Sequence, residues 1–320
     1  MKKTKITAIV ALAITVSVSA LLIVFHSAAN GKPTVNQKRN TLNSVNMAKK
    51  ERKVPTDKPK DMQKNKLSGI SMNKERNMPV LLHNLSSKRG IPILLYHHIL
   101  KRSENTFTRD PAVINLEAFE EQMKYLYDLK YHIATMAELE SYLHGGEVPN
   151  KTVVISFDDG LKTNYIYAYP ILKKYNFRAI NFLITGRLAQ KPVPFQPEKL
   201  QYLSWPEVDA MRDVFEYGSH TNALHDKVLG FPGLIAEPDQ VILNDLTISK
   251  NLLKTNFFAY PFGAFNDRAI RLLKLAGYQY AFTTIPVDAR FGDNPYTIGR
   301  IAIYPNTDLD QFIKIVQTIK

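Results

Sequence analysis

The chain has 320 residues, of which 45% are hydrophobic, no cysteine, and a formal net charge of +13. A sequence without cysteine excludes a disulfide framework and a thiolate metal site, so any metal would need His, Asp or Glu ligands. The positive charge is concentrated in residues 30–89, which carry 15 Lys and Arg against 4 Asp and Glu, whereas residues 90–320 carry 24 against 25. A globular part this close to neutral gives no support to nucleic-acid binding, and no such partner is expected.

The first 29 residues contain an uncharged apolar run from Ile6 to Phe25, preceded by three lysines. A run of about 20 residues can cross a bilayer, whereas the apolar region of a signal peptide is shorter, about 7 to 15 residues. We therefore predict that residues 1–29 are a membrane anchor that holds the lysines inside the cell and the rest of the chain outside. Small residues at positions 27–29 leave cleavage and secretion as the alternative.

Residues 30–88 are rich in Lys, Asn, Ser and Met and show no sustained hydrophobic periodicity. This composition predicts a flexible, disordered basic linker between the anchor and the globular part. Its charge would suit anionic lipid or an anionic cell-wall polymer. A solvated spacer without a specific partner is the alternative.

From residue 89 to residue 320, short apolar runs alternate with amphipathic helical patterns. The predicted strands are Ile91–Tyr96, Thr152–Phe157, Ala179–Ile184, Val214–Gly218, Asn256–Tyr260, Tyr280–Thr284 and Ile298–Ile303. The predicted helices are Leu116–Leu129, Met136–Leu143, Asn164–Tyr175, Trp205–Arg212, Glu237–Leu253, Asp267–Ala276 and Leu309–Ile319. The alternation predicts an α/β fold with a parallel sheet, better suited to a closed or nearly closed β/α barrel than to an open sheet. In such barrels the functional residues follow the carboxyl ends of the strands.

Acidic and histidine side chains follow two of these strands. Asp158 and Asp159 end one strand just before Gly160, and His220 and His225 follow another. One carboxylate and two imidazoles can hold a divalent metal and leave positions open for water and substrate, a role that Asp159, His220 and His225 could fill. Asp158 beside them could be the general base. Because neighbouring strand residues point to opposite sides, a sharp turn at Gly160 would be needed to aim both acids at one site.

Three motifs, "SFDDG", "GSHTNALH" and "AYPFG", resemble those of the NodB-homology polysaccharide deacetylases, carbohydrate esterase family four, over roughly residues 90–305. The resemblance implies a distorted (β/α)7 barrel that hydrolyses the N-acetyl group of an acetylglucosamine-containing polymer. It also implies that Asp158 is the general base and that the backbone N–H of Phe262 helps to stabilise the oxyanion. The implied metal ligands are Asp159, His220 and His225. Such ligands fit Zn²⁺ best, with Co²⁺, Ni²⁺ or Mn²⁺ as alternatives.

The sequence departs from the common family motifs in three places. His220 and His225 are five residues apart rather than four, and Ala259 stands where many relatives have an arginine that steadies the catalytic aspartate. The segment Ile298–Ile303 lacks the histidine that supplies the general acid in many relatives. The three departures coincide in the subgroup similar to the poly-β-1,6-N-acetylglucosamine deacetylases of biofilm matrix.

That subgroup carries a Tyr-His pair near the start of the domain, as Tyr96-His97 does here. We therefore predict that His97 protonates the leaving amine, with a purely structural strand-end histidine as the alternative. Arg300 could replace the missing arginine, or it could form an ordinary ion pair.

Three aromatic residues could contact a sugar: Trp205, Tyr260 and Phe262. Each could equally pack in the core, and Trp205 opens a predicted helix, where packing is the commoner role. The predicted function is a metal-dependent N-deacetylase acting outside the cell on a poly-β-1,6-N-acetylglucosamine-like polymer. The enzyme alternatives are a peptidoglycan or chitin-type N-deacetylase and an O-acetyl esterase on the same fold. An alternative of another class is a non-catalytic protein that binds carbohydrate or assembles at the cell surface.

Overall fold

The structure is a computed structural model that describes residues 89–317. The anchor predicted for residues 1–29 and the linker predicted for residues 30–88 lie outside the described residues. Within residues 89–317, no helix is both long enough and apolar enough to cross a membrane.

Seven strands form a parallel sheet in the order β11-β10-β7-β6-β5-β1-β12, and a short strand, β4, pairs with β5. Their bounds are β1 Ile93–Tyr96, β4 His132–Ile133, β5 Thr152–Phe157, β6 Ala179–Leu183, β7 Phe215–Ser219, β10 Phe257–Ala259, β11 Tyr280–Phe282 and β12 Ile301–Ala302. Each of the seven predicted strands is present, some of them shorter than predicted. The α/β class and the parallel sheet are therefore confirmed.

The central strands are hydrophobic because both faces of the sheet are covered. All six residues of β5 are buried, as expected for a parallel strand between two apolar layers. Val153, Ile155 and Phe157 join the larger hydrophobic cluster, whereas Val154 joins a second cluster that contains Phe182 and residues of β11. The alternation along β5 therefore fixes which side chains fill each layer.

The sheet is curled into a half-barrel and is not closed by a continuous ladder. Only Phe258 and Ser219 are in register between β10 and β7. The two edges of the sheet approach through the last part of the chain, where Ile298 forms a single bridge to Phe282 of β11 and β12 pairs with β1. The distorted (β/α)7 barrel predicted from the family resemblance thus appears as a curled sheet whose edges meet at one bridge.

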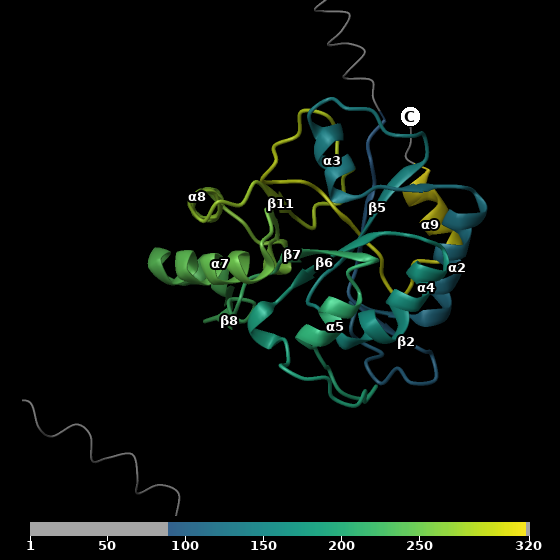
Figure 1. Cartoon of the computed structure of the whole chain (residues 1–320), viewed down its shortest axis with the longest axis horizontal. Coiled ribbons are helices and arrows are strands. Elements are labelled where there is room, and N and C mark those ends of the chain that lie inside the picture. The colour runs from purple at the N-terminus through teal and green to yellow at the C-terminus, as the bar shows by residue number, and fades with distance from the viewer. Residues whose placement is uncertain (1–88, 318–320) are drawn as a thin grey trace, which may run out of the picture. The chain divides into compact units, whose positions relative to one another are not determined.

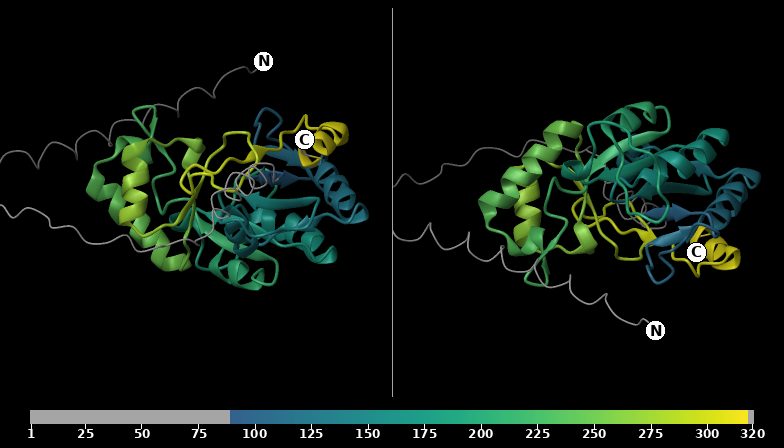
Figure 2. Two further views of the ribbon diagram at one scale, coloured as in Figure 1. Left: turned by 90° about the horizontal axis from the view of Figure 1, so that it is seen from above. Right: turned by 90° about the horizontal axis from the view of Figure 1, so that it is seen from below.

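Helices surround this sheet, as Figure 1 shows. The α-helices are α2 Leu116–Asp128, α3 Met136–Leu143, α4 Tyr169–Lys174, α5 Trp205–Ala210, α6 Gly233–Ala236, α7 Asp239–Leu253, α8 Asp267–Leu275 and α9 Leu309–Val316. Short π and 3₁₀ turns are η1 Asn164–Ala168, η2 Thr185–Arg187 and η3 Pro261–Gly263. In Figure 2 the green α7 and α8 lie at one end of the described part, with the blue α2 and the yellow α9 at the other.

Two small strand pairs were not predicted, and neither was β4. β2 (His98–Leu100) pairs with β3 (Val113–Asn115), and β8 (Lys227–Val228) pairs with β9 (Phe231–Pro232). Each strand has only two or three residues, too few for an alternating pattern to stand out in the sequence. The first pair follows directly after His97, and the second follows His225, so both lie next to predicted site residues.

Candidate active site

The turn after β5 brings the two neighbouring acids to the same site. Asp159 has a φ of 72° and Gly160 has a φ of 71°, so two consecutive residues are left-handed. Aspartate is one of the few residues with a side chain that adopts this conformation readily. A Cβ on Gly160 would lie 2.8 Å from Leu183 Cδ2, so a larger residue there would also displace the end of that side chain. The turn predicted at Gly160 therefore begins one residue earlier, at Asp159.

Asp158 forms a buried bidentate ion pair with Arg300. The guanidinium Nη1 and Nη2 atoms each lie 2.7 Å from one carboxylate oxygen, and Arg300 Nε donates to the Thr283 carbonyl at 3.0 Å. Burial by itself raises the pKa of Asp158, but the positive charge of Arg300, with help from His220, holds that pKa below its usual value. Asp158 is therefore a carboxylate at neutral pH, with its plane fixed by the two hydrogen bonds.

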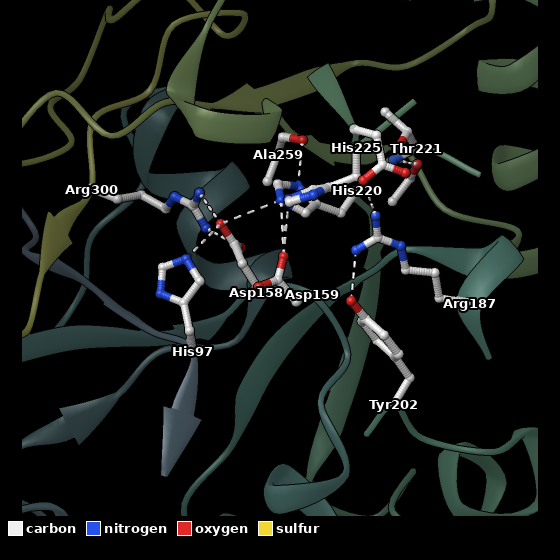
Figure 3. A network of polar contacts seen from close by, with 12 residues as sticks. His97, Asp158, Asp159, Arg187, Tyr202, His220, Thr221, His225, Ala259 and Arg300 are labelled. Carbon is white, nitrogen blue, oxygen red and sulfur yellow. Dashed lines mark hydrogen bonds and ion pairs between the residues drawn. The ribbon is translucent and has the colours of Figure 1, made fainter. Parts of the chain in front are cut away.

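Asp159, His220 and His225 form the second half of the site, shown with Asp158 and Arg300 in Figure 3. Asp159 Oδ1 lies 3.1 Å from His225 Nε2 and 3.6 Å from His220 Nε2. The three groups each offer one ligand atom, and these atoms all lie within 4.8 Å of one another. Residues separated by 66 positions in the sequence thus meet at one point.

The ring of His220 is oriented by a backbone carbonyl. His220 Nδ1 lies 2.8 Å from the Ala259 oxygen, so this nitrogen carries the proton and Nε2 presents its lone pair toward Asp159. Burial lowers the pKa of His220 to about 4, although Asp158 opposes the shift, so the ring is neutral at physiological pH. A neutral imidazole with a free Nε2 is the form that binds a metal.

One carboxylate oxygen of Asp159 lacks a hydrogen-bond donor. Its Oδ1 is buried without a well-aligned hydrogen bond, even though His225 is close. Burial raises the pKa of Asp159, but the close approach of His225 and the charges of the surrounding histidines outweigh this and leave the pKa lowered. A buried anionic oxygen between two imidazole nitrogens fits a divalent cation, because the cation would satisfy all three ligand atoms.

His97 lies on the other side of Asp158, at the bend between β1 and β2. Its Nε2 is 4.0 Å from Asp158 Oδ2, and its side chain is 26% exposed, so it can reach both the carboxylate and solvent. Its backbone carbonyl accepts a hydrogen bond at 3.0 Å from Asn164, which opens the π-helical turn η1. The next residue, His98, is instead buried, and burial lowers its pKa to about 4.

The three aromatic candidates have different environments. Phe262 is 50% exposed, has a φ of 59°, and its ring centre lies 4.8 Å from that of His225. Tyr260 is fully buried, and its hydroxyl donates to the Tyr296 carbonyl at 3.0 Å, which fits the alternative that its side chain packs in the core. Trp205 packs partly buried against the larger hydrophobic cluster, and its contact with sugar stays a prediction.

Sequence reasoning missed Arg187 and Tyr202. Arg187 donates to the Tyr202 hydroxyl and to Asp226, in both cases at 2.6 Å. Figure 3 shows this pair beside the histidines. Burial raises the pKa of Tyr202, and the negative charge of Asp159 contributes to the shift. Arg187 lies in η2, just after the carboxyl end of β6, and this position after a strand is the sequence signal for it.

A curled parallel sheet with paired acids and two histidines at the carboxyl ends of its strands presents the acid–base groups and candidate metal ligands of a hydrolase active site. The polysaccharide deacetylase family model matches residues 145–281. The chain is also 32% identical over 199 residues to the poly-β-1,6-N-acetyl-D-glucosamine N-deacetylase of Staphylococcus aureus, covering 59% of this chain and 67% of that protein. The chain therefore belongs to the polysaccharide deacetylase family and is a hydrolytic deacetylase.

Solved structures agree with this assignment. The structure of IcaB from Ammonifex degensii matches with a TM-score of 0.62 and 28% identity, over 72% of this chain and 98% of that one. A Streptococcus pyogenes deacetylase, PplD, in complex with acetate matches with a TM-score of 0.61 and 26% identity, again over 72% and 98%. The family model spans both acids and both histidines, whereas His97 and Arg300 lie outside the residues it matches.

Proposed function

We propose that the chain is a metal-dependent N-deacetylase that acts outside the cell on a poly-β-1,6-N-acetylglucosamine-like polysaccharide. The observation that carries this proposal is the Asp159, His220 and His225 cluster beside the Asp158–Arg300 pair. The similarity to the Staphylococcus aureus enzyme supports the choice of polymer. Asp159, His220 and His225 would hold one divalent cation, with Zn²⁺ favoured over Co²⁺, Ni²⁺ or Mn²⁺ for this ligand set.

Asp158 is the general base in this proposal. When bound, the cation would polarise the acetyl carbonyl and make a neighbouring water more acidic. Asp158 takes the proton from the attacking water, and Arg300 keeps the carboxylate ionised and oriented toward the site. The backbone N–H of Phe262 donates no hydrogen bond within the described residues, so it is free to bind the developing oxyanion.

His97 is the proposed general acid. Breaking the carbon–nitrogen bond releases an amine that must gain a proton, while the acetyl carbon leaves as acetate. His97 is the histidine on the solvent-accessible side of Asp158, opposite His220 and His225 (Figure 3). His97 does not belong to the cluster of three candidate ligands, so its ring is free to deliver this proton.

Replacement of His97 by Asn is expected to lower kcat for acetate release by about 100-fold, because the leaving amine loses its proton donor. Metal content and KM should stay near those of the wild type. Steady-state kinetics together with elemental analysis of the purified variant measure both. His144→Asn, which removes an exposed histidine, is the matched control. Equal kcat in the two variants would remove His97 from this role.

Removing the metal tests the central proposal. Dialysis against a chelator is expected to stop acetate release from acetylglucosamine oligomers, and stoichiometric Zn²⁺ should restore it, because Asp159, His220 and His225 then regain their cation. Acetate is measured by an enzyme-coupled assay. Full activity in protein shown by elemental analysis to be metal-free would contradict the proposal.

The choice of polymer needs a separate comparison. Faster release from β-1,6 oligomers than from β-1,4 oligomers or acetylated xylan is expected for the proposed substrate. Preference for β-1,4 oligomers would favour a peptidoglycan or chitin-type enzyme, and preference for xylan would favour an O-acetyl esterase. The non-catalytic alternative is set aside by membership of a family of hydrolytic deacetylases.

The extracellular location rests on the sequence. The apolar run Ile6–Phe25 with its lysine flank supports a single-pass anchor, and cleavage at residues 27–29 would instead secrete the enzyme. The basic residues 30–88 would bring the linker to anionic lipid or cell-wall polymer. Fractionation of cells that express the full chain tests this, and enzyme found only in the medium would exclude the anchor.

A further inference from the structure

The loop between the two histidines, residues 221–224, determines where the second histidine lies. His220 directly follows β7, and its ring is fixed by the Ala259 carbonyl. His225 comes after four further residues, and the first of these, Thr221, has a φ of 73°. A threonine is rarely left-handed and stays so only where its surroundings hold it. The position of His225 therefore depends on what holds the loop.

A carboxylate from α7 binds the backbone of this loop. Asp245 is only 6% exposed, its Oδ1 accepts from the Asn222 N–H at 2.8 Å, and its Oδ2 accepts from the Ala223 N–H at 2.6 Å. A buried carboxylate is costly unless it is hydrogen-bonded, and consecutive backbone N–H groups form a natural anion-binding pocket. These hydrogen bonds satisfy both the Asp245 carboxylate and the two backbone N–H groups, and they restrict the conformation of the loop.

Other contacts hold the same loop from two sides. On α7, one turn after Asp245, the Ser249 hydroxyl donates to the Thr221 carbonyl at 3.4 Å. From the η2 turn, Thr185 N–H donates to the Thr221 carbonyl at 3.1 Å and Gly186 N–H donates to the Asn222 carbonyl at 2.9 Å. A Cβ on Gly186 would lie 2.6 Å from the Asn222 oxygen, so only glycine permits this approach. Among these contacts, Asp245 supplies the charged one.

We infer that Asp245 is a positioning residue of the metal site, which fixes His225 at the distance from His220 and Asp159 that one cation requires. The inference rests on the proposed metal dependence. It also gives a physical account of the five-residue spacing of the histidines, because a loop of four residues has more backbone N–H groups to satisfy and more freedom to restrict. Groups that contact the ligand residues, and not the metal itself, commonly influence metal affinity.

The test measures Zn²⁺ affinity of the full-length chain in detergent by competition with a chromophoric chelator. Asp245→Asn is expected to bind Zn²⁺ about 10- to 100-fold more weakly, because the amide keeps one acceptor and turns an N–H toward the other backbone donor. Asp245→Ala should bind more weakly still. At saturating Zn²⁺ the kcat of Asp245→Asn should return toward that of the wild type, since the reacting groups are unchanged.

Asp239→Asn is the matched control, because Asp239 lies on the same helix and pairs with Arg268 and Arg271 away from the loop. It is expected to lower the melting temperature while Zn²⁺ affinity stays near the wild-type value. Equal affinity in Asp245→Asn and the wild type, with folding checked by circular dichroism, would overturn the inference. A wild-type chain that binds no Zn²⁺ would instead overturn the proposed metal dependence. If Asp245→Ala does not fold, the Zn²⁺ affinity of the near-isosteric Asp245→Asn variant alone tests the inference.

Discussion

Replacement of Asp158 by Asn is expected to lower kcat for acetate release by about 10²- to 10⁴-fold, the contribution of a general base. An amide cannot take the proton from the attacking water. Asp159, His220 and His225 are unchanged, so the variant should still bind metal. The Asp158 carboxylate is the group in the site that is both ionised and held rigidly, through its two hydrogen bonds from Arg300.

The measurement combines kcat with metal content and a thermal melt. Stability must be followed because the uncharged amide of Asp158→Asn would leave the buried Arg300 guanidinium without a negative partner, and breaking a buried pair costs about 3–5 kcal/mol. Asp209→Asn is the control, since Asp209 is exposed and pairs with Arg212 on the surface. Activity within a few-fold of the wild type, in folded and metalated Asp158→Asn, would mean that another group is the base.

Replacement of Arg300 by Met is expected to shift the acidic limb of the kcat/KM profile to higher pH. In the wild type, burial raises the pKa of Asp158 but the Arg300 charge, with the nearby histidines, lowers it by more. Without the Arg300 charge the effect of burial is no longer offset, so the pKa of the base rises and less of it is ionised at a given pH. The pH profile of kcat/KM for a soluble oligomer measures this shift.

The same variant is expected to lose stability in a pH-dependent way. In the wild type the pKa of Asp158 is below its unfolded value, so its stabilising contribution is present above the unfolded pKa and is lost as pH falls through the folded pKa. In Arg300→Met the folded pKa lies higher, so ionised Asp158 destabilises the fold as pH rises. The difference in unfolding free energy should be about 3–5 kcal/mol near neutral pH and should shrink toward acid pH.

Thermal melts at several pH values check this result, with Arg300→Lys as the conservative comparison. Lysine keeps the positive charge but cannot form the bidentate pair. In Arg300→Lys the acidic limb of the kcat/KM profile should therefore return toward its wild-type pH. The Asp158 carboxylate would be oriented less well, so kcat should recover less. An unchanged pH profile in Arg300→Met would show that Arg300 does not control the ionisation of Asp158.

The sequence predicted the elements better than their ends. Seven strands and seven helical segments could be placed because apolar runs alternate with helical periodicity. The short strands β2, β3, β4, β8 and β9 escaped prediction because two or three residues carry no period of their own, whereas the equally short β12 lies within the longer predicted strand Ile298–Ile303. The role of Tyr260 stayed open for a different reason: the side chain of a residue at a strand end can face either the site or the core, and its packing against Phe258 and Phe265 is visible only in the tertiary structure.

Residue type alone determined the chemistry available to this protein. With no cysteine, any metal ligands are restricted to His, Asp and Glu, and the spacing of the acids and histidines pointed to Asp158, Asp159, His220 and His225 before any contact was known. These groups can be predicted from the sequence because the turn and the strand end that present them depend on residues close by in the chain.

Only the tertiary structure decided which distant residues complete the site. Arg300 lies 142 positions from Asp158, and they meet because β12, which follows Arg300, pairs with β1, which in turn pairs with β5. Asp245 reaches the histidine loop because α7 packs against β7. Strand order and helix packing follow from the summed burial of many apolar side chains, a property that no short segment of sequence contains.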